Sequence, residues 1–112
     1  HGPGFWRHIS GDADQAPPGY PTGPVTRGGL LLRLLDRYPN LYCDLSAHSG
    51  LNAISRDPEF GKRFLLKYSS RVMYGTDMFT REHIDYLRSI DLPKKAFEAI
   101  TRQNALRLVP VG

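Results

Sequence analysis

The stretch Arg71-Val72-Met73-Tyr74-Gly75-Thr76-Asp77 is a short apolar run that stops at a glycine and is followed by a hydroxyl and a carboxylate. A run of this length is consistent with a buried strand. In parallel α/β folds, functional groups gather at the carboxyl ends of the strands. Asp77 occupies such a position, but it could instead cap the helix that follows. The stretch by itself leaves both interpretations open.

Helix and strand patterns alternate upstream of this predicted strand. Apolar residues recur at helical spacing from Leu30 to Tyr38, and Pro39 is expected to end that helix. Residues 40–45 are brief and largely apolar, which predicts a strand, and residues 46–56 are expected to form a polar loop. Together these segments predict a helix, a strand and a loop in that order.

A second helix is predicted between that loop and the stretch at 71–77. Asp57 is a suitable N-cap, and Pro58 fits the first helical position. The buried face of this helix is expected to carry Phe60, Phe64, Leu65 and Tyr68. Alternation of helices and strands predicts right-handed βα units with a parallel sheet, so the expected fold class is α/β.

Two more helices are predicted after Asp77. Thr80 is a candidate N-cap for the first, and His83 within this helix is expected to face solvent. Pro93 is expected to open the last helix, with Leu106 and Leu108 closing its packing. Helical spacing of the apolar residues supports both predictions.

The N-terminal part of the chain is rich in glycine and proline. Residues 1–8 are expected to form a turn or loop, because two glycines flank a proline. Residues 10–29 remain loop-like in composition, and a structureless run of this length is unusual inside a compact domain. This segment is therefore expected to be either disordered or a long functional loop.

Composition narrows the classes of partner. The chain has 112 residues, enough for one domain, and 15 basic against 11 acidic residues. The basic residues are scattered at helical spacing, which is typical of solvated helix faces, so no nucleic-acid partner is expected. The single cysteine, Cys43, lies in an apolar run and is expected in the core of a reducing, cytoplasmic protein. No apolar stretch approaches the ~20 residues of a membrane helix, so no membrane association is expected.

Four motifs, taken in order, resemble one enzyme family. They are His1-Gly2-Pro3-Gly4-Phe5, the phrase YPNLYCDLS at 38–46, VMYGTD at 72–77 and QNALRL at 103–108. The set is similar to the amidohydrolase-related metal-dependent hydrolases, a group that also contains metal-dependent decarboxylases. The similarity extends over nearly the whole chain, and residues 10–29 contribute least to it.

The resemblance implies a TIM-like (β/α)8 barrel, a fold of about 250 residues. Residues 1–112 would then be a single partial domain, the C-terminal portion that spans about strands six to eight. His1 matches the family's histidine after strand six, and Asp77 matches its aspartate after strand eight. The family's metal-binding His-x-His after strand one and its histidine after strand five are absent from this sequence, so a truncated barrel is expected.

The resemblance also implies catalytic roles. Asp77 would bind a divalent metal, expected to be zinc, and accept a proton from metal-bound water. His1 would act as a base beside the metal or polarise the substrate. His48 is a candidate substrate contact or a simple polar loop residue, and Trp6 either lines a substrate pocket or covers the barrel rim. Asp44 could orient a neighbouring group or hydrogen-bond a loop.

Three functions remain open from the sequence. The first is part of a metal-dependent hydrolase with a small-molecule substrate, and the second is part of a decarboxylase of the same family. The third is a non-catalytic chain that binds a partner or self-associates to cover exposed sheet edges. In each case the isolated chain is expected to be inactive and to need either a second copy or the missing barrel half.

Overall fold

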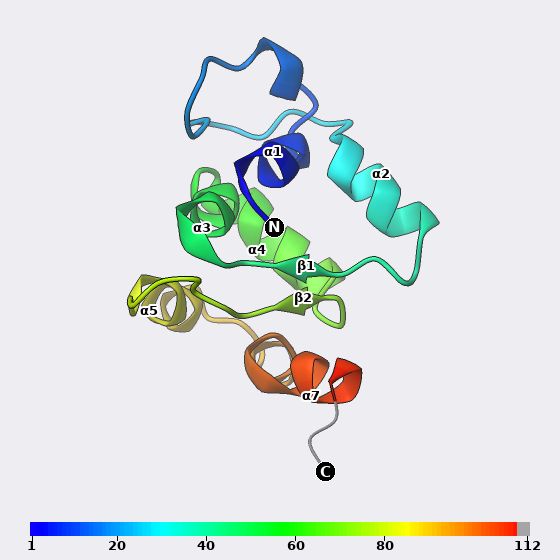
Figure 1. The fold of residues 1–112 in the computed structure, drawn as a ribbon, viewed down its shortest axis with the longest axis vertical. Helices are drawn as coiled ribbons and strands as arrows, with labels where there is room; N and C mark the ends of the chain where they lie inside the picture. Colours follow the sequence, from blue (N-terminus) through cyan, green and yellow to red (C-terminus); the bar gives the residue numbers. More distant parts are fainter. Residues whose placement is uncertain (110–112) are drawn as a thin grey trace.

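Two parallel strands lie at the centre of the molecule (Figure 1), in a computed structural model that describes residues 1–109. Strand β1 (Cys43–Asp44) pairs with β2 (Val72–Met73), with Cys43 opposite Val72. The predicted parallel pairing is confirmed, although the regular strands are shorter than the apolar segments that contain them. Cys43, Leu45 and Val72 are completely buried, so the apolar character of both strands serves the core.

The helices surround this strand pair. The α-helices are α1 (Pro3–Trp6), α2 (Leu30–Arg37), α3 (Ala47–Ser55), α4 (Pro58–Lys67), α5 (Glu82–Ser89), α6 (Lys94–Glu98) and α7 (Asn104–Leu108). Short 3-10 helices span Arg7–Ile9 and Ala13–Gln15, and a π-helical turn, Ala99–Gln103, joins α6 to α7. Figure 1 shows the N-terminal segment and α2 on the side of β1, and the C-terminal helices on the side of β2.

Helices α2 and α4 agree with the sequence patterns. Helix α2 buries Leu31 and Leu35, and it ends before Pro39. Helix α4 begins as expected, because the Asp57 side chain accepts a hydrogen bond from the Phe60 amide and Pro58 follows the cap. The predicted face of α4 packs into the core through Phe64, Leu65 and Tyr68, and Phe60 packs against it from its edge.

Helices α1 and α3 lie where loops were expected, so these two predictions are wrong. In α1, Pro3 occupies the first turn, where its missing N–H costs nothing, and Gly2 takes a positive φ of 93° just before it. Helix α3 carries small residues that conceal its helical pattern. Gly50 is one of them, since a Cβ there would overlap the carbonyl group of Leu45, and α3 therefore approaches the end of β1 closely.

The long segment 10–29 is ordered by side chains of α3 and its neighbours. The Arg56 guanidinium donates hydrogen bonds to the carbonyl oxygens of residues 22–24. Asn52 Nδ2 donates to the Pro21 carbonyl, and the Val25 amide donates to Asp57 Oδ2 at 3.0 Å. Of the two alternatives for this segment, the structure has an ordered loop rather than a disordered one.

Two further predictions for the C-terminal half are wrong. His83 is buried rather than solvent-facing, with only 1% of its surface exposed. It shares the buried face of α5 with Leu87, one helical turn away. Leu106 and Leu108 are exposed, and α7 instead packs through Asn104, which is completely buried.

The outer edge of each strand is occupied by a hydrogen-bonding group from another segment. Beside β2, Asn104 Nδ2 donates to the Val72 carbonyl at 2.8 Å, and the Tyr74 amide donates to the Ile100 carbonyl at 2.8 Å. Beside β1, the indole Nε1 of Trp6 donates to the Asp44 carbonyl at 3.0 Å. Because unpaired edge groups invite further strand pairing, these contacts limit the exposed edge of the sheet.

Candidate functional site

Three ionisable side chains converge at the carboxyl ends of the two strands. His1 Nε2 lies 3.6 Å from Asp77 Oδ2, and His1 Nδ1 lies 3.7 Å from Asp44 Oδ2. All three side chains are accessible, at 47% for His1, 42% for Asp44 and 62% for Asp77. The structure thus brings together the predicted pair His1 and Asp77, and it adds Asp44 to them.

Asp77 lies in a tight turn after β2. Its φ is 56°, a left-handed conformation that aspartate tolerates better than most residues. The turn is tied to the start of α3, because the Ala47 amide donates to the Thr76 carbonyl at 2.8 Å. Helix α5 begins only at Glu82, whose amide donates to Thr80 Oγ1 at 3.2 Å. Thr80, rather than Asp77, therefore contacts the first turn of that helix.

Asp44 is anchored on two sides. Its Oδ1 accepts hydrogen bonds from the amide of Ser46, at 2.7 Å, and from the Ser46 hydroxyl. Its carbonyl accepts the hydrogen bond from Trp6 Nε1. Asp44 was expected either to hydrogen-bond a loop or to orient a neighbouring group, and the structure is compatible with both. Its Oδ1 accepts hydrogen bonds from Ser46 in the turn after β1, while its Oδ2 faces His1.

Gly75 makes room for this arrangement. A Cβ at position 75 would overlap the Ser46 hydroxyl and lie 3.0 Å from Asp44 Oδ1. The glycine that ends the β2 segment is thus needed for close approach to Ser46 and Asp44. A turn glycine in sequence does not distinguish this role from conformational freedom, so this role could not be predicted.

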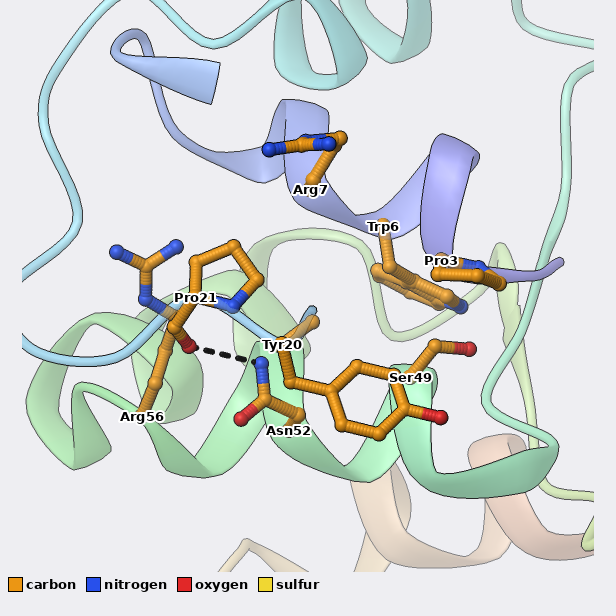
Figure 2. A pocket seen from close by; sticks show the side chains of 9 residues that line it. Pro3, Trp6, Arg7, Tyr20, Pro21, Ser49, Asn52 and Arg56 are labelled. Atoms are coloured by element: carbon orange, nitrogen blue, oxygen red, sulfur yellow. Dashed lines mark hydrogen bonds between the residues drawn. The ribbon is translucent and has the colours of Figure 1, made fainter. Parts of the chain in front are cut away.

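Trp6 belongs to the core. It is 1% exposed, and its ring contacts Phe64 edge-on, with centroids 6.0 Å apart. It also lines a cavity of about 10 Å³ between the N-terminal helices, α3 and the ordered loop (Figure 2). Tyr20 and Pro21 form part of the opposite wall, and the Pro21 carbonyl accepts a hydrogen bond from Asn52 Nδ2. This cavity has room for about one water molecule.

His48 lies apart from the three converging side chains, on the first turn of α3. Its Nδ1 is 3.7 Å from Glu82 Oε2, and its ring centroid is 6.5 Å from that of Tyr20. These three residues line a shallow surface depression together with Asn52 and Leu51. His48 is therefore half exposed in this depression, and its role as a substrate contact stays a prediction.

His83 fastens α5 to the start of α3. Its Nε2 lies 2.8 Å from the Ala47 carbonyl, and because a carbonyl can only accept, Nε2 carries the proton. Ala47 has a φ of 63°, which is costly for a residue with a Cβ, and the bonds at both its amide and its carbonyl hold it there. The helical spacing of His83 and Leu87 is the sequence signal that could have identified this buried residue.

Cys43 is inert in this fold. It is completely buried next to the core face of Val72, and burial raises the pKa of its thiol to about 11. Since the thiolate is the nucleophilic form, the folded chain holds Cys43 in its unreactive state at neutral pH. This confirms the interpretation of Cys43 as a core residue.

Carboxylate oxygens and an imidazole nitrogen are ligand types that suit a divalent metal. Within residues 1–109, however, no cluster of three or more His, Cys, Asp or Glu side chains is arranged to hold a metal ion. The side chains of His1 and Asp77 are exposed to solvent and could contact a metal ion. They would supply only some of the ligands of such a site. In the part of the chain that the structure describes, none of the helices has the length and the apolar composition of a membrane span.

Comparison with known proteins identifies the family. The amidohydrolase family model matches residues 28–111, which include β1, β2, Asp44 and Asp77. Searches of curated proteins and of solved structures found no match to this chain. Members of the matched family have a TIM-barrel fold and generally use divalent metals. The family model covers most of the sequence, and the chain therefore belongs to the amidohydrolase family.

Proposed function

We propose that this chain supplies the C-terminal portion of the active site of a metal-dependent hydrolase. The convergence of His1 and Asp77, with 3.6 Å between Nε2 and Oδ2, carries this proposal. The two residues come from separate parts of the chain and meet where the parallel strands end. In TIM barrels, catalytic groups are found at the carboxyl ends of the strands.

The proposal assigns β1 and β2 to the seventh and eighth strands of a (β/α)8 barrel. Their parallel pairing and the helices α3 and α4 between them support this order. His1 would then follow the sixth strand. The remaining ligands would come from the earlier strands of a complete barrel, because one histidine with nearby carboxylates is too small a set for a tight site.

Asp77 is the proposed metal ligand and proton acceptor. Its carboxylate is open to solvent and faces an imidazole, so it can both hold a cation and exchange a proton with a neighbour. When bound, a divalent ion such as zinc supplies Lewis acidity and lowers the pKa of water towards neutrality. His1 receives or donates the proton on the Asp77 side, a role that imidazole performs near neutral pH. The expected substrate is a small molecule with a hydrolysable bond.

A zinc titration followed by NMR tests the metal site on the chain itself. Adding Zn²⁺ to the ¹⁵N-labelled protein is expected to shift the resonances of His1, Asp44 and Asp77 first, even where binding is weak. Asp77→Asn removes the charged ligand and should abolish these shifts. Asp85→Asn is the matched control, because Asp85 is an exposed carboxylate on α5 that pairs with Arg81. Shifts centred on His48 and Glu82, or shifts unchanged by Asp77→Asn, would contradict the proposal.

A further inference from the structure

We propose that Asp44 is a positioning residue that holds the neutral imidazole of His1 with its proton on Nδ1, so that the Nε2 lone pair faces Asp77. The importance of this tautomer for proton transfer rests on the proposed function, whereas the tautomer itself can be measured without it.

The His1 ring lies between two carboxylates. Nδ1 faces Asp44 Oδ2 at 3.7 Å, and Nε2 faces Asp77 Oδ2 at 3.6 Å. Both carboxylates accept hydrogen bonds, but a neutral imidazole has only one N–H to donate. Which nitrogen carries the proton is set by the better acceptor. Both distances are slightly longer than an ordinary hydrogen bond, so the His1 ring must move towards the carboxylate to which it donates.

Asp44 is the better placed of the two acceptors. The Ser46 amide and hydroxyl both bond its Oδ1, and its backbone carbonyl is held by Trp6. With Oδ1 fixed in this way, Oδ2 is directed at His1. Asp77 is 62% exposed against 42% for Asp44, so water competes more strongly for the Asp77 carboxylate. In a complete site its carboxylate would also bind the metal.

The tautomer determines what His1 can do. With the proton on Nδ1, Nε2 is an unprotonated acceptor beside Asp77, as a base requires. With the proton on Nε2, the ring could only donate a hydrogen bond in that direction. Asp44 therefore acts on the reaction through His1, without touching the substrate.

The anchoring by Ser46 makes the test sharp. In Asp44→Asn, the amide oxygen must take the place of Oδ1, because two donors from Ser46 point there. The amide NH₂ then takes the place of Oδ2 and presents a donor to His1 Nδ1. Nδ1 can only accept from this donor, so the proton is expected to move to Nε2. This substitution is thus predicted to invert the tautomer rather than merely weaken the contact.

The experiment records the imidazole ¹⁵N chemical shifts of the 112-residue chain at about pH 9, well above the ordinary histidine pKa. The protonated and unprotonated ring nitrogens have widely separated shifts, and His1→Ala identifies the His1 signals. In the wild-type chain most His1 rings should carry the proton on Nδ1, and in Asp44→Asn most should carry it on Nε2. Asp77→Asn makes the same chemical change on the other side of the ring, and it should leave Nδ1 protonated.

Two results would overturn the inference. One is a wild-type His1 ring that is protonated mainly on Nε2, and the other is an equal change of tautomer in Asp44→Asn and Asp77→Asn. The Trp6 indole N–H resonance reports whether the end of β1 is intact, since Trp6 bonds the Asp44 carbonyl. If Asp44→Asn unfolds, Ser46→Ala replaces it, because it removes one of the two hydrogen bonds that hold Oδ1 and should lower the Nδ1–H population. The ¹⁵N measurement uses neither metal nor substrate. Its outcome is therefore independent of the zinc titration, and failure of one is distinguishable from failure of the other.

Discussion

His1 and Asp77 face each other, with 3.6 Å between the imidazole Nε2 and the carboxylate Oδ2, although α1, α2, β1, α3, α4 and β2 lie between them in sequence. The parallel pairing of β1 and β2 places Asp44 and Asp77 at the same edge of the sheet, because parallel strands end at the same edge. The N-terminal segment that carries His1 is held at this edge by the hydrogen bond from Trp6 Nε1 to the Asp44 carbonyl. The site thus depends on strand direction and on the docking of the N-terminal segment against β1.

The isolated chain is expected to lose zinc on dialysis. Among residues 1–109, the ionisable side chains that converge at the strand ends are His1, Asp44 and Asp77, and their closest contacts are pairwise. A tight zinc site needs three or four protein ligands at about 2 Å from the ion. Metal analysis of the dialysed protein should find far less than one zinc per chain. One tightly held zinc per chain would show that the chain completes a site by itself.

Gly75→Ala is expected to destabilise the fold and disturb the site together. The added methyl group would overlap the Ser46 hydroxyl and crowd Asp44 Oδ1, so the hydrogen bonds between these residues must shift. Overpacking of this kind costs about 1–3 kcal/mol, which urea unfolding can measure. Gly4→Ala is the control, because a Cβ at position 4 meets no atom within 4 Å. Equal effects of the two substitutions would contradict the packing role of Gly75.

Asn104→Leu is expected to destabilise the chain strongly despite its similar size. Asn104 Nδ2 donates to the carbonyls of Ser69, at 2.6 Å, and Val72, at 2.8 Å. Leucine would leave both acceptors without this donor, at about 1–3 kcal/mol for each one kept from water. Faster hydrogen exchange at the Tyr74 amide, which bonds Ile100 beside it, should accompany the loss. Gln103→Leu, at an exposed neighbouring position, should change the unfolding free energy by within about 0.5 kcal/mol.

Alkaline pH is expected to destabilise the fold through Cys43. Burial raises the pKa of its thiol from 9.0 to about 11, so the unfolded chain loses this proton first as the pH rises. The stabilising contribution is therefore complete below pH 9.0 and is lost as the pH rises towards 11. For this group the loss totals about 2–3 kcal/mol.

Cys43→Ala tests this prediction through the slope of unfolding free energy against pH, which should become shallower above pH 9.0. The difference in slope between the wild-type chain and Cys43→Ala reports on the thiol alone. Tyr68 and Tyr86, whose pKa values burial also raises, are present in both proteins. In the folded wild-type chain, the thiol should react slowly with a thiol reagent at neutral pH and rapidly after unfolding. An unchanged slope would mean that Cys43 is solvated in the folded state.

Much of the chain could be predicted from local signals. Apolar spacing identified α2 and α4, and the Asp57-Pro58 pair identified the start of α4. The alternation of helices and strands predicted the parallel pairing of β1 and β2. These features depend on neighbouring residues or on a simple rule of connection, so a one-dimensional pattern contains them.

Other features escaped prediction because small or polar residues form them. Helix α3 approaches Leu45 through Gly50, and its small residues carry little periodic signal. His83 and Asn104 are polar, and they are buried because each finds carbonyl partners in another segment. Pattern analysis assigns such residues to the surface, since the cost of burying them depends on partners that it does not contain.

The sequence by itself determined which segments are apolar, and hence that two strands would be buried with functional groups following them. It also placed Asp77 after a strand as a candidate, and the resemblance to the amidohydrolase-related hydrolases added His1. Only the tertiary structure decided that Asp44 joins them, that Gly75 must lack a side chain, and that the C-terminal helices occupy the outer edge of β2. The reason is physical: burial follows from each residue's own hydrophobicity, whereas contacts between distant segments depend on how all of the segments pack together.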